Sequence, residues 1–340
     1  MTEVTNQTVD PEDGELRLDR WFRRHYPQLT QGRLQKLLRT GQVRVDGRRA
    51  EAGLRVRPGQ VVRVPPLGEG GAGKAPAAPR PVSARDAERL QASVLYIDDD
   101  VLVIDKPSGL AVQGGSGTPH HLDAMLDALR YGSRERPRLV HRLDRDTSGV
   151  MVLARSPAAA AALAAAFRHK DARKIYWAIV AGRPRLRQGR IDAALAKRGG
   201  SQAGPKGERV TVVADDDDDA RRAVTLYDTL DSAGPKATWL ALWPVTGRTH
   251  QLRAHCALMG TPILGDPKYG GAAAAVPAPE AAQRLHLHAR SIAIPRPRGG
   301  ILRATAPLPE DLRATWELLG FDPAQYNKQR DDDPFAGVEP

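Results

Sequence analysis

The sequence has only one cysteine, Cys256, among its 340 residues. A lone cysteine excludes a disulfide framework and a metal site built from thiolates. No apolar run approaches the ~20 residues that a membrane-spanning helix needs. Residues 1–13 are polar and acidic, without the basic and apolar segments of a secretion signal. These absences predict a cytoplasmic protein that does not associate with membranes.

The net charge of +11 is unevenly distributed along the chain. Residues 14–65 contain thirteen Arg and Lys against four Asp and Glu, a net +9, so the remainder is close to neutral. Leu18 and Trp21 begin an apolar pattern at helical spacing, and Thr30 is a candidate N-cap for a second helix. A single surface arginine is often only solvated, but thirteen basic residues on so small a unit indicate contacts with the phosphates of a polyanion.

This basic module resembles the S4 RNA-binding domain. The similarity is carried by the helix pair, at 17–22 and 32–41, and by Val43-Arg44-Val45 with the Asp46-Gly47 turn after it. It implies binding of structured RNA through the second helix and the following loop. The basic residues that we expect to contact RNA are Arg17, Arg20, Arg33, Lys36, Arg39 and Arg44.

Residues 66–90 are predicted to form a flexible linker, because the stretch after Pro65 is rich in Gly, Ala and Pro. Within it, Gly68 to Lys74 fits the G-x-x-x-x-G-K pattern of a phosphate-binding loop. The next residue is Ala75, where such a loop needs Ser or Thr, and Pro76 prevents the helix that must follow. No nucleotide cofactor is therefore expected.

Residues 91–322 have the pattern of an α+β domain, and the polar residues 323–340 are predicted to be a disordered tail. Ser156-Pro157 starts an alanine-rich helix as N-cap and first helical residue. His286 and His288 lie two residues apart on a predicted strand. Because no third ligand lies nearby in the sequence, we expect both to be structural and not to bind a metal.

The most unusual stretch of this domain is a polar turn, residues 141–149, between two apolar segments. His141 to Asp146 holds two carboxylates and three basic side chains, and Thr147-Ser148-Gly149 ends the turn. A solvated loop does not need this composition, whereas a loop that holds one carboxylate in a fixed place can use it. From composition alone, either Asp144 or Asp146 could be that carboxylate.

Two further polar segments follow. Residues 174–182 alternate as a strand, with Lys174 and Tyr176 on the same face. A lone tyrosine on a strand is more often a packing residue than a functional one. Residues 246–253 turn from a strand into a helix and contain Arg253.

The polar turn, His141-Arg142-Leu143-Asp144-Arg145-Asp146-Thr147-Ser148-Gly149, resembles the signature of the RluA-type pseudouridine synthases. The two further polar segments fall where that family has its second and third motifs, and the similarity extends from about Val94 to Leu319. An S4 domain in front is the arrangement of the members that act on the large ribosomal subunit. The resemblance implies a mixed, mostly antiparallel sheet with flanking helices and a central cleft, and it implies no cofactor and no metal.

The family converts uridine to pseudouridine: the C1′–N1 bond breaks, the base rotates, and C5 bonds to C1′. By resemblance, Asp144 is the catalytic carboxylate, Arg253 is its charge partner, and Tyr176 stacks on the target base and helps to remove the C5 proton. The base must be flipped out of folded RNA, and by resemblance Arg142 fills the gap that it leaves. The other expected substrate contacts are His141, Ile263 and Leu264.

The expected partner is large-subunit ribosomal RNA or a pre-ribosomal particle, and the expected state is a monomer. Two alternatives keep part of this interpretation: the same activity on transfer RNA, or a non-catalytic assembly factor in which the S4 domain alone binds RNA. A third, a glycosidase using Asp144 and Asp146, is disfavoured because carboxylates two residues apart in a tight turn need not straddle a bond.

Overall fold

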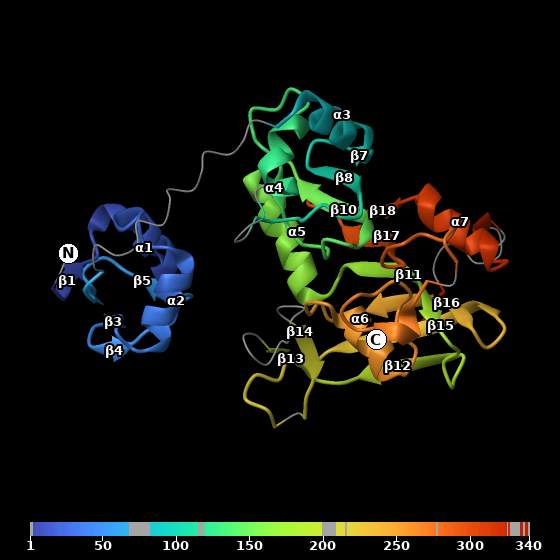
Figure 1. Cartoon of the computed structure of the whole chain (residues 1–340). Helices are drawn as coiled ribbons and strands as arrows, with labels where there is room; N and C mark the ends of the chain where they lie inside the picture. Colours follow the sequence, from blue (N-terminus) through green and yellow to red (C-terminus); the bar gives the residue numbers. More distant parts are fainter. Residues whose placement is uncertain are drawn as a thin grey trace. The chain divides into compact units, whose positions relative to one another are not determined.

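The computed structural model describes residues 3–67, 82–114, 118, 120–198, 209–214, 216–276, 278–324, 326, 334–335 and 337–338. The chain divides into two compact units, Met1–Pro81 and Val82–Pro340, which Figure 1 draws with their helices and strands. Residues 68–81 of the predicted linker and most of the predicted tail lie outside the described ranges.

The first unit packs two helices, α1 (Leu18–His25) and α2 (Gln31–Arg39), against short strands. Its four-stranded sheet has the order β1-β6-β3-β4, and a separate pair joins β2 to β5. The remaining elements are β1 Thr5–Thr8, η1 Pro11–Asp13, β2 Leu16–Arg17, β3 Arg44–Val45, β4 Arg48–Arg49, β5 Arg55–Val56 and β6 Val61–Val64.

The sequence pattern of this unit is confirmed residue by residue. Leu18 and Trp21 are completely buried in its apolar core. The Thr30 hydroxyl accepts a hydrogen bond from the backbone N–H of Arg33 at 3.4 Å and so caps α2. Asp46-Gly47 have φ of 48° and 76°, the left-handed geometry of a two-residue hairpin turn.

The unit begins earlier than the predicted boundary of residue 14. Strand β1 pairs antiparallel with β6, and Asp13 is buried. The Asp13 carboxylate accepts hydrogen bonds from the Trp21 indole at 3.0 Å and from His25 at 2.7 Å. The pairing of β1 with β6 joins segments that are far apart in the sequence, so the local pattern could not show it.

The second unit is built on a ten-stranded sheet in which β10 and β17 are parallel and the other pairs are antiparallel. The predicted mixed, mostly antiparallel sheet is thus confirmed. The main order is β12-β15-β16-β11-β17-β10-β8-β7, with β18 on β17 and β9 on β10. The strands are β7 Val94–Ile97, β8 Val101–Lys106, β9 Arg138–Leu139, β10 Ser148–Ala154, β11 Arg173–Ala181, β12 Gln188–Asp192, β15 Val224–Ala233, β16 Ala237–Pro244, β17 Leu287–Pro295 and β18 Ile301–Thr305; β13 Leu195–Arg198 and β14 Arg209–Val212 form a separate pair.

Helices flank this sheet, and α5 contacts β10 and β17 (Figure 1). As predicted, the hydroxyl of Ser156 caps α5 by accepting a hydrogen bond from the Ala159 N–H at 3.1 Å. The helices are α3 Ala84–Ala92, α4 Leu122–Met125, η2 Leu126–Leu129, α5 Pro157–His169, α6 Gln251–Leu258, η4 Gly271–Ala274 and α7 Glu310–Leu318.

Two further predicted boundaries need correction. Helix α3 lies largely inside residues 66–90, the predicted linker, because this stretch after Ser83 lacks Gly and Pro and the Ser83 hydroxyl caps it by accepting from the Asp86 N–H at 3.1 Å. Part of the predicted disordered tail is packed: Phe335 is buried and its ring centroid lies 5.8 Å from that of Trp243. An aromatic residue that finds an apolar partner is ordered even in a polar segment.

The two halves of the sheet meet at Gly149. There, β10 pairs Ser148 with His288 and Gly149 with Ala289. Gly149 has φ of 114°, and a Cβ at this position would lie 2.2 Å from the Ala289 carbonyl oxygen. Only glycine fits so close an approach of two backbones. The polar turn ends at this junction, so the contact between β10 and β17 fixes where the turn lies.

Candidate active site

A cavity of about 490 Å³ lies beside the polar turn, a volume typical of small-ligand sites. The side chains predicted from the sequence that line it are His141, Arg142, Asp144, Tyr176 and Arg253. They come from the polar turn, from strand β11 and from helix α6. The fold therefore brings the three motifs, which are widely separated in the sequence, around one space.

The two carboxylates of the polar turn have different surroundings. Asp144 is half-buried, lines the cavity, and has no side-chain hydrogen bond or ion pair with any described residue. Asp146 does not line the cavity: its carboxylate accepts a hydrogen bond from Arg145 Nε at 3.1 Å, and its backbone carbonyl accepts one from Ser108 Oγ at 2.8 Å. The geometry leaves Asp144 available for chemistry and uses Asp146 to hold the turn.

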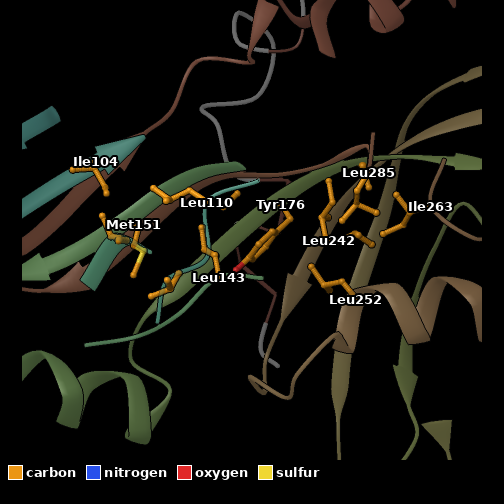
Figure 2. Packing of buried hydrophobic residues seen from close by; sticks show 14 of the residues in the cluster. Ile104, Leu110, Leu143, Met151, Tyr176, Leu242, Leu252, Ile263 and Leu285 are labelled. Carbon is orange, nitrogen blue, oxygen red and sulfur yellow. The ribbon is translucent and has the colours of Figure 1, made fainter. Parts of the chain in front are cut away.

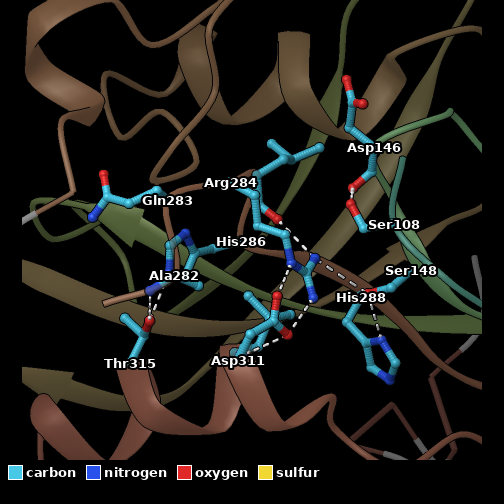
Figure 3. Close-up of polar contacts among 12 residues, drawn as sticks. Ser108, Asp146, Ser148, Ala282, Gln283, Arg284, His286, His288, Asp311 and Thr315 are labelled. Atoms are coloured by element: carbon cyan, nitrogen blue, oxygen red, sulfur yellow. Dashed lines mark hydrogen bonds and ion pairs between the residues drawn. The ribbon is translucent and has the colours of Figure 1, made fainter. Parts of the chain in front are cut away.

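A chain of hydrogen bonds fixes the side of the polar turn that faces away from the cavity (Figure 3). Ser148 Oγ donates to His288 Nδ1 at 3.0 Å, and His288 Nε2 donates to the Ala306 carbonyl at 3.4 Å. Arg284 donates to Ser148 Oγ at 3.5 Å and binds Asp311 at 2.5 and 2.9 Å. Burial lowers the pKa of His288 to about 3, so its ring is neutral and structural, as predicted.

Lys106 ties the polar turn to the end of β8. Its side chain is completely buried, and Nζ donates to the backbone carbonyls of Pro107 at 2.7 Å, Leu110 at 3.0 Å and Arg145 at 3.1 Å. Burial is the largest effect on this amine and lowers its pKa to about 7. Since three carbonyls satisfy its three donors, Lys106 supports the turn from inside the protein.

The sequence predicted Arg253 as the charge partner of Asp144, and the structure shows no ion pair between these two side chains. Its guanidinium instead binds Asp266 through two hydrogen bonds of 2.7 and 2.6 Å, and both side chains are almost inaccessible. Burial alone would raise the pKa of Asp266, but hydrogen bonding and charge from Arg253 lower it below its ordinary value. Burial alone would lower the pKa of Arg253, but the hydrogen bond and charge of Asp266 and the charge of Asp144 raise it above its ordinary value. Asp144 therefore lies within electrostatic reach of Arg253. A buried guanidinium needs a close carboxylate, and only the fold shows that Asp266 supplies it.

Tyr176 projects from β11 among the apolar side chains that border the cavity, with Leu143 on one side and Leu252 on the other (Figure 2). Burial, together with the negative charge of Asp144, raises the pKa of its phenol well above the ordinary value. The register of β11 against β17 shifts just before Tyr176, a bulge of the kind that re-aims side chains near functional sites. The neutral ring thus offers a flat face beside Asp144.

Arg142 and His141 differ although they are neighbours. Arg142 is exposed at the cavity and has no hydrogen-bond or ion-pair partner among the described residues. His141 accepts a hydrogen bond at Nε2 from the Val152 N–H at 2.9 Å and stacks on Phe167 with ring centroids 4.4 Å apart. Burial and then the charge of Lys174 lower the pKa of His141 to about 3, so it anchors the turn as a neutral ring.

Ile263 and Leu264, which the sequence predicted as substrate contacts, do not line the cavity. Both are almost completely buried. Ile263 packs in the same apolar cluster as Tyr176, and the backbone N–H of Leu264 donates to the Ile179 carbonyl at 2.9 Å. Their segment runs beside β11, a pairing between distant parts of the chain, and this makes them core residues.

The sequence prediction also missed His250, which lines the cavity. It has left-handed backbone angles, φ 52° and ψ 19°, and directly precedes α6. Its Nδ1 lies 2.9 Å from the hydroxyl of Tyr269. The signal available in the sequence was the place of His250 inside the third motif, three residues before Arg253.

The basic residues predicted to contact RNA lie in the first unit. Arg33 is half-buried and the other five are exposed. Arg17 forms an ion pair with Asp19 at 2.8 Å, so part of its charge is compensated. The other four exposed residues of this set form no side-chain ion pair with a described residue; they are Arg20, Lys36, Arg39 and Arg44.

No group of three or more His, Cys, Asp and Glu side chains could hold a metal ion in the part of the chain that the structure describes. Within the same ranges, every helix is too short or too polar to cross a membrane.

Comparisons with known proteins identify the family of this chain. A family model described as RNA pseudouridylate synthase matches residues 100–258, and a model of the S4 domain matches residues 16–62. A Rickettsia typhi protein named ribosomal large subunit pseudouridine synthase C is 37% identical over 267 residues, which cover 75% of this chain and 82% of that protein. A Vibrio cholerae protein of the same name is 34% identical over 297 residues, covering 87% and 90%. The solved structure of human RNA pseudouridylate synthase domain containing 4 has a TM-score of 0.57 at 28% identity and covers 69% of this chain and 96% of that one.

As its motifs predicted, the chain belongs to the RNA pseudouridylate synthase family, which is a family of isomerases, and it carries an S4 domain before the catalytic unit.

Proposed function

We propose that this protein converts specific uridines of large-subunit ribosomal RNA to pseudouridine, with Asp144 acting on a nucleotide that has been flipped out of the RNA. The observation that carries the proposal is the position of Asp144. Its carboxylate binds no side chain or backbone group of the described residues and lies in a cavity next to an aromatic face. The RNA class is supported by the names of the relatives, which are large-subunit synthases, and by the basic S4 domain.

The reaction is an isomerisation, so every atom of the nucleotide is retained. The C1′–N1 bond breaks, the uracil rotates, C5 bonds to C1′, and the proton on C5 is replaced by one on N1. Whether Asp144 adds to C1′, adds to C6 or removes a proton from the sugar, it must be ionised. Arg253 lies within electrostatic reach of Asp144, and Asp266 holds Arg253 in place.

Tyr176 and Arg142 supply the other two functions that the reaction needs. The flat, neutral ring of Tyr176 provides a stacking surface for the uracil beside Asp144. Arg142 has a guanidinium that no described residue binds, and a planar guanidinium can stack and form hydrogen bonds where the flipped base was. Since the raised pKa keeps the phenol protonated near neutral pH, its oxygen can accept the C5 proton only while it gives up its own.

We also propose that the enzyme acts as a monomer. It would act in the cytoplasm, on ribosomal RNA or on an assembling large subunit. The measured mass in solution tests the monomer: a stable dimer at working concentration would contradict it.

The experiment that tests the function is a map of pseudouridines in total RNA from cells with and without this gene. We expect sites in large-subunit ribosomal RNA to disappear and to return with the wild-type gene but not with Asp144→Asn. Loss of sites in transfer RNA alone would contradict the RNA class. If no site changes and Asp144→Asn restores every growth defect of the deletion, the protein acts through RNA binding alone.

A further inference from the structure

His250 is a residue of the cavity wall that the roles above leave unused. It lines the cavity together with Asp144, and its backbone is left-handed. For a residue with a Cβ this conformation is less stable than the ordinary helical one. The fold bears this cost at the residue where the chain enters α6, three residues before Arg253. Backbone strain of this kind is concentrated at active sites and ligand-binding positions.

Hydrogen bonds fix which ring nitrogen of His250 carries the proton. The Tyr269 hydroxyl accepts a hydrogen bond from the Val210 N–H at 3.0 Å and lies 2.9 Å from His250 Nδ1. Among the described residues, Nδ1 is the one acceptor that the hydroxyl proton of Tyr269 reaches. The neutral ring therefore accepts at Nδ1 and carries its proton at Nε2. The edge-on packing of the two rings, with centroids 5.7 Å apart, holds this orientation.

The Nε2–H of His250 has no hydrogen-bond partner among the described residues, although the side chain is half-buried. Burial is the largest influence on the ring and lowers its pKa; Asp144 and Asp266 act in the opposite direction, and Arg253 and Lys268 reinforce the lowering. The ring is thus a neutral donor at physiological pH. A donor left without a protein partner in the wall of a cavity is one that a bound ligand can satisfy.

Tyr269 and Asp266 position this donor and Arg253 together. Asp266 accepts hydrogen bonds from the backbone N–H groups of Lys268 and Tyr269 at 2.8 and 3.0 Å, while it binds the Arg253 guanidinium. The Arg253 guanidinium in turn lies over the Tyr269 ring, 5.1 Å from its centroid. One short loop therefore sets the orientation of both groups.

We propose that His250 is a catalytic residue that donates a hydrogen bond from Nε2 to a carbonyl oxygen of the flipped uracil. The inference rests on the proposed function. When the C1′–N1 bond breaks, the base keeps the electron pair, and if a nucleophile first adds at C6 the electrons also move onto the base. In either case negative charge gathers on the uracil carbonyl oxygens until C5 bonds to C1′. A fixed donor at such an oxygen stabilises the transition state more than the ground state.

The test compares His250→Ala and His250→Gln with the wild-type enzyme on a synthetic stem-loop that contains a uridine mapped by the experiment above. We expect His250→Ala to lower kcat by about 10²-fold with KM and RNA affinity nearly unchanged, the usual loss for one donor to developing negative charge. His250→Gln keeps an N–H donor and should lose less. Tyr269→Phe, which removes the proton that fixes Nδ1, is the positioning control, with an expected loss of roughly tenfold and a changed pH profile of kcat.

A chemical change in the RNA separates contact with the base from a structural effect. The same stem-loop is made with 2-thiouridine or 4-thiouridine at the target, because sulfur is a weaker acceptor than oxygen. We expect one of these substitutions to slow the wild-type enzyme and to cost His250→Ala nothing further, which is the non-additivity of two partners in one contact. Equal sulfur effects in both enzymes would overturn the proposal, whatever the size of the loss in His250→Ala.

The outcomes distinguish this proposal from the proposed function. If the wild-type enzyme modifies no large-subunit RNA, the proposed substrate is wrong, and the His250 comparison is made on the RNA that it does modify. Wild-type activity together with full activity of His250→Ala would overturn the role of His250 alone. Thermal unfolding of each variant, expected within a few degrees of wild type, shows that a lost rate is not lost folding.

Discussion

The polar groups on the two sides of the polar turn differ in their hydrogen bonding. On the cavity side, Asp144, Arg142 and His250 Nε2 have no partners among the described residues. On the opposite side, Lys106 meets three carbonyls, and Ser148 is bound to His288 and Arg284. Since an unsatisfied buried polar group is costly, unpaired groups in the wall of a cavity are ones that a bound ligand can satisfy. The unpaired groups face the cavity, and the paired groups hold the turn in place.

The most direct test of this difference replaces one carboxylate on each side of the turn by an amide. Asp144→Asn should lower kcat by on the order of 10³-fold or more. The melting temperature should stay nearly constant, because the carboxylate binds none of the described residues. Asp146→Asn is the matched control and should keep most of the activity. Single-turnover pseudouridine formation and thermal unfolding measure both effects. Similar losses of kcat in the two variants would contradict the division.

The junction beneath the polar turn offers a test of stability. Gly149→Ala places a Cβ 2.2 Å from the Ala289 carbonyl oxygen at a φ of 114°, so the backbones of β10 and β17 must separate. We expect the free energy of unfolding to fall by more than about 3 kcal/mol. Gly109 also has a positive φ, 84°, but an added Cβ there meets nothing within 4 Å. Gly109→Ala should therefore cost only about 1 kcal/mol in urea unfolding. Equal costs would show that backbone strain, and not the close approach, makes Gly149 necessary.

Part of the fold and of the candidate site could be predicted from the sequence alone. The helix starts at Thr30 and Ser156 and the antiparallel sheet followed from local pattern and from the family motifs. Asp144, Tyr176 and Arg142, which short motifs carry, all line the cavity, and the roles predicted for them stay predictions.

The remaining features depend on contacts between segments that are distant in the sequence. Arg253 was assigned to Asp144, but the loop that brings Asp266 to Arg253 is a tertiary feature with no local signal. Ile263 and Leu264 were predicted to contact the substrate, but both are buried. Their burial follows from the pairing of their segment with β11, which the local sequence does not show. The packed Phe335 was missed for the same reason.

The paired side should also set how the protein responds to acid. Burial lowers the pKa of His288 to about 3 and of His286 to about 4, against 6.5 for an ordinary histidine. Below pH 6.5 the unfolded chain binds protons that these folded rings cannot bind, so stability is full above 6.5 and falls as the pH drops toward 4. Asp105, whose pKa burial raises to about 6, opposes this trend over the same window.

We therefore expect the melting temperature to fall between pH 6.5 and 4, and His288→Gln to make that fall shallower. The measurement is thermal unfolding of both proteins in a series of buffers at constant ionic strength. A melting temperature that rises on acidification would mean that the carboxyl group of Asp105 dominates the two histidines.

The smallest expected effect lies in the S4 unit, where exposed charges can be compared with a paired one. Lys36→Gln and Arg39→Gln should each reduce the slope of log affinity against log salt by about 1 and leave kcat at saturating RNA unchanged. Arg17→Gln is the control, because its charge is already compensated by Asp19, and it should change the slope less. Equal slopes for all variants and the wild type would place the RNA contacts of this unit elsewhere.

The parallel pairing of β10 with β17 also governs when the enzyme can become active during its synthesis. Ser148 and its partner His288 are 140 residues apart in the chain. Because a nascent chain emerges from its N-terminal end, the S4 unit, with its own core, leaves the ribosome long before β17 does. The polar turn therefore stays without its support until residues near 290 have been made. A chain that is still being synthesised can bind RNA before it can modify it.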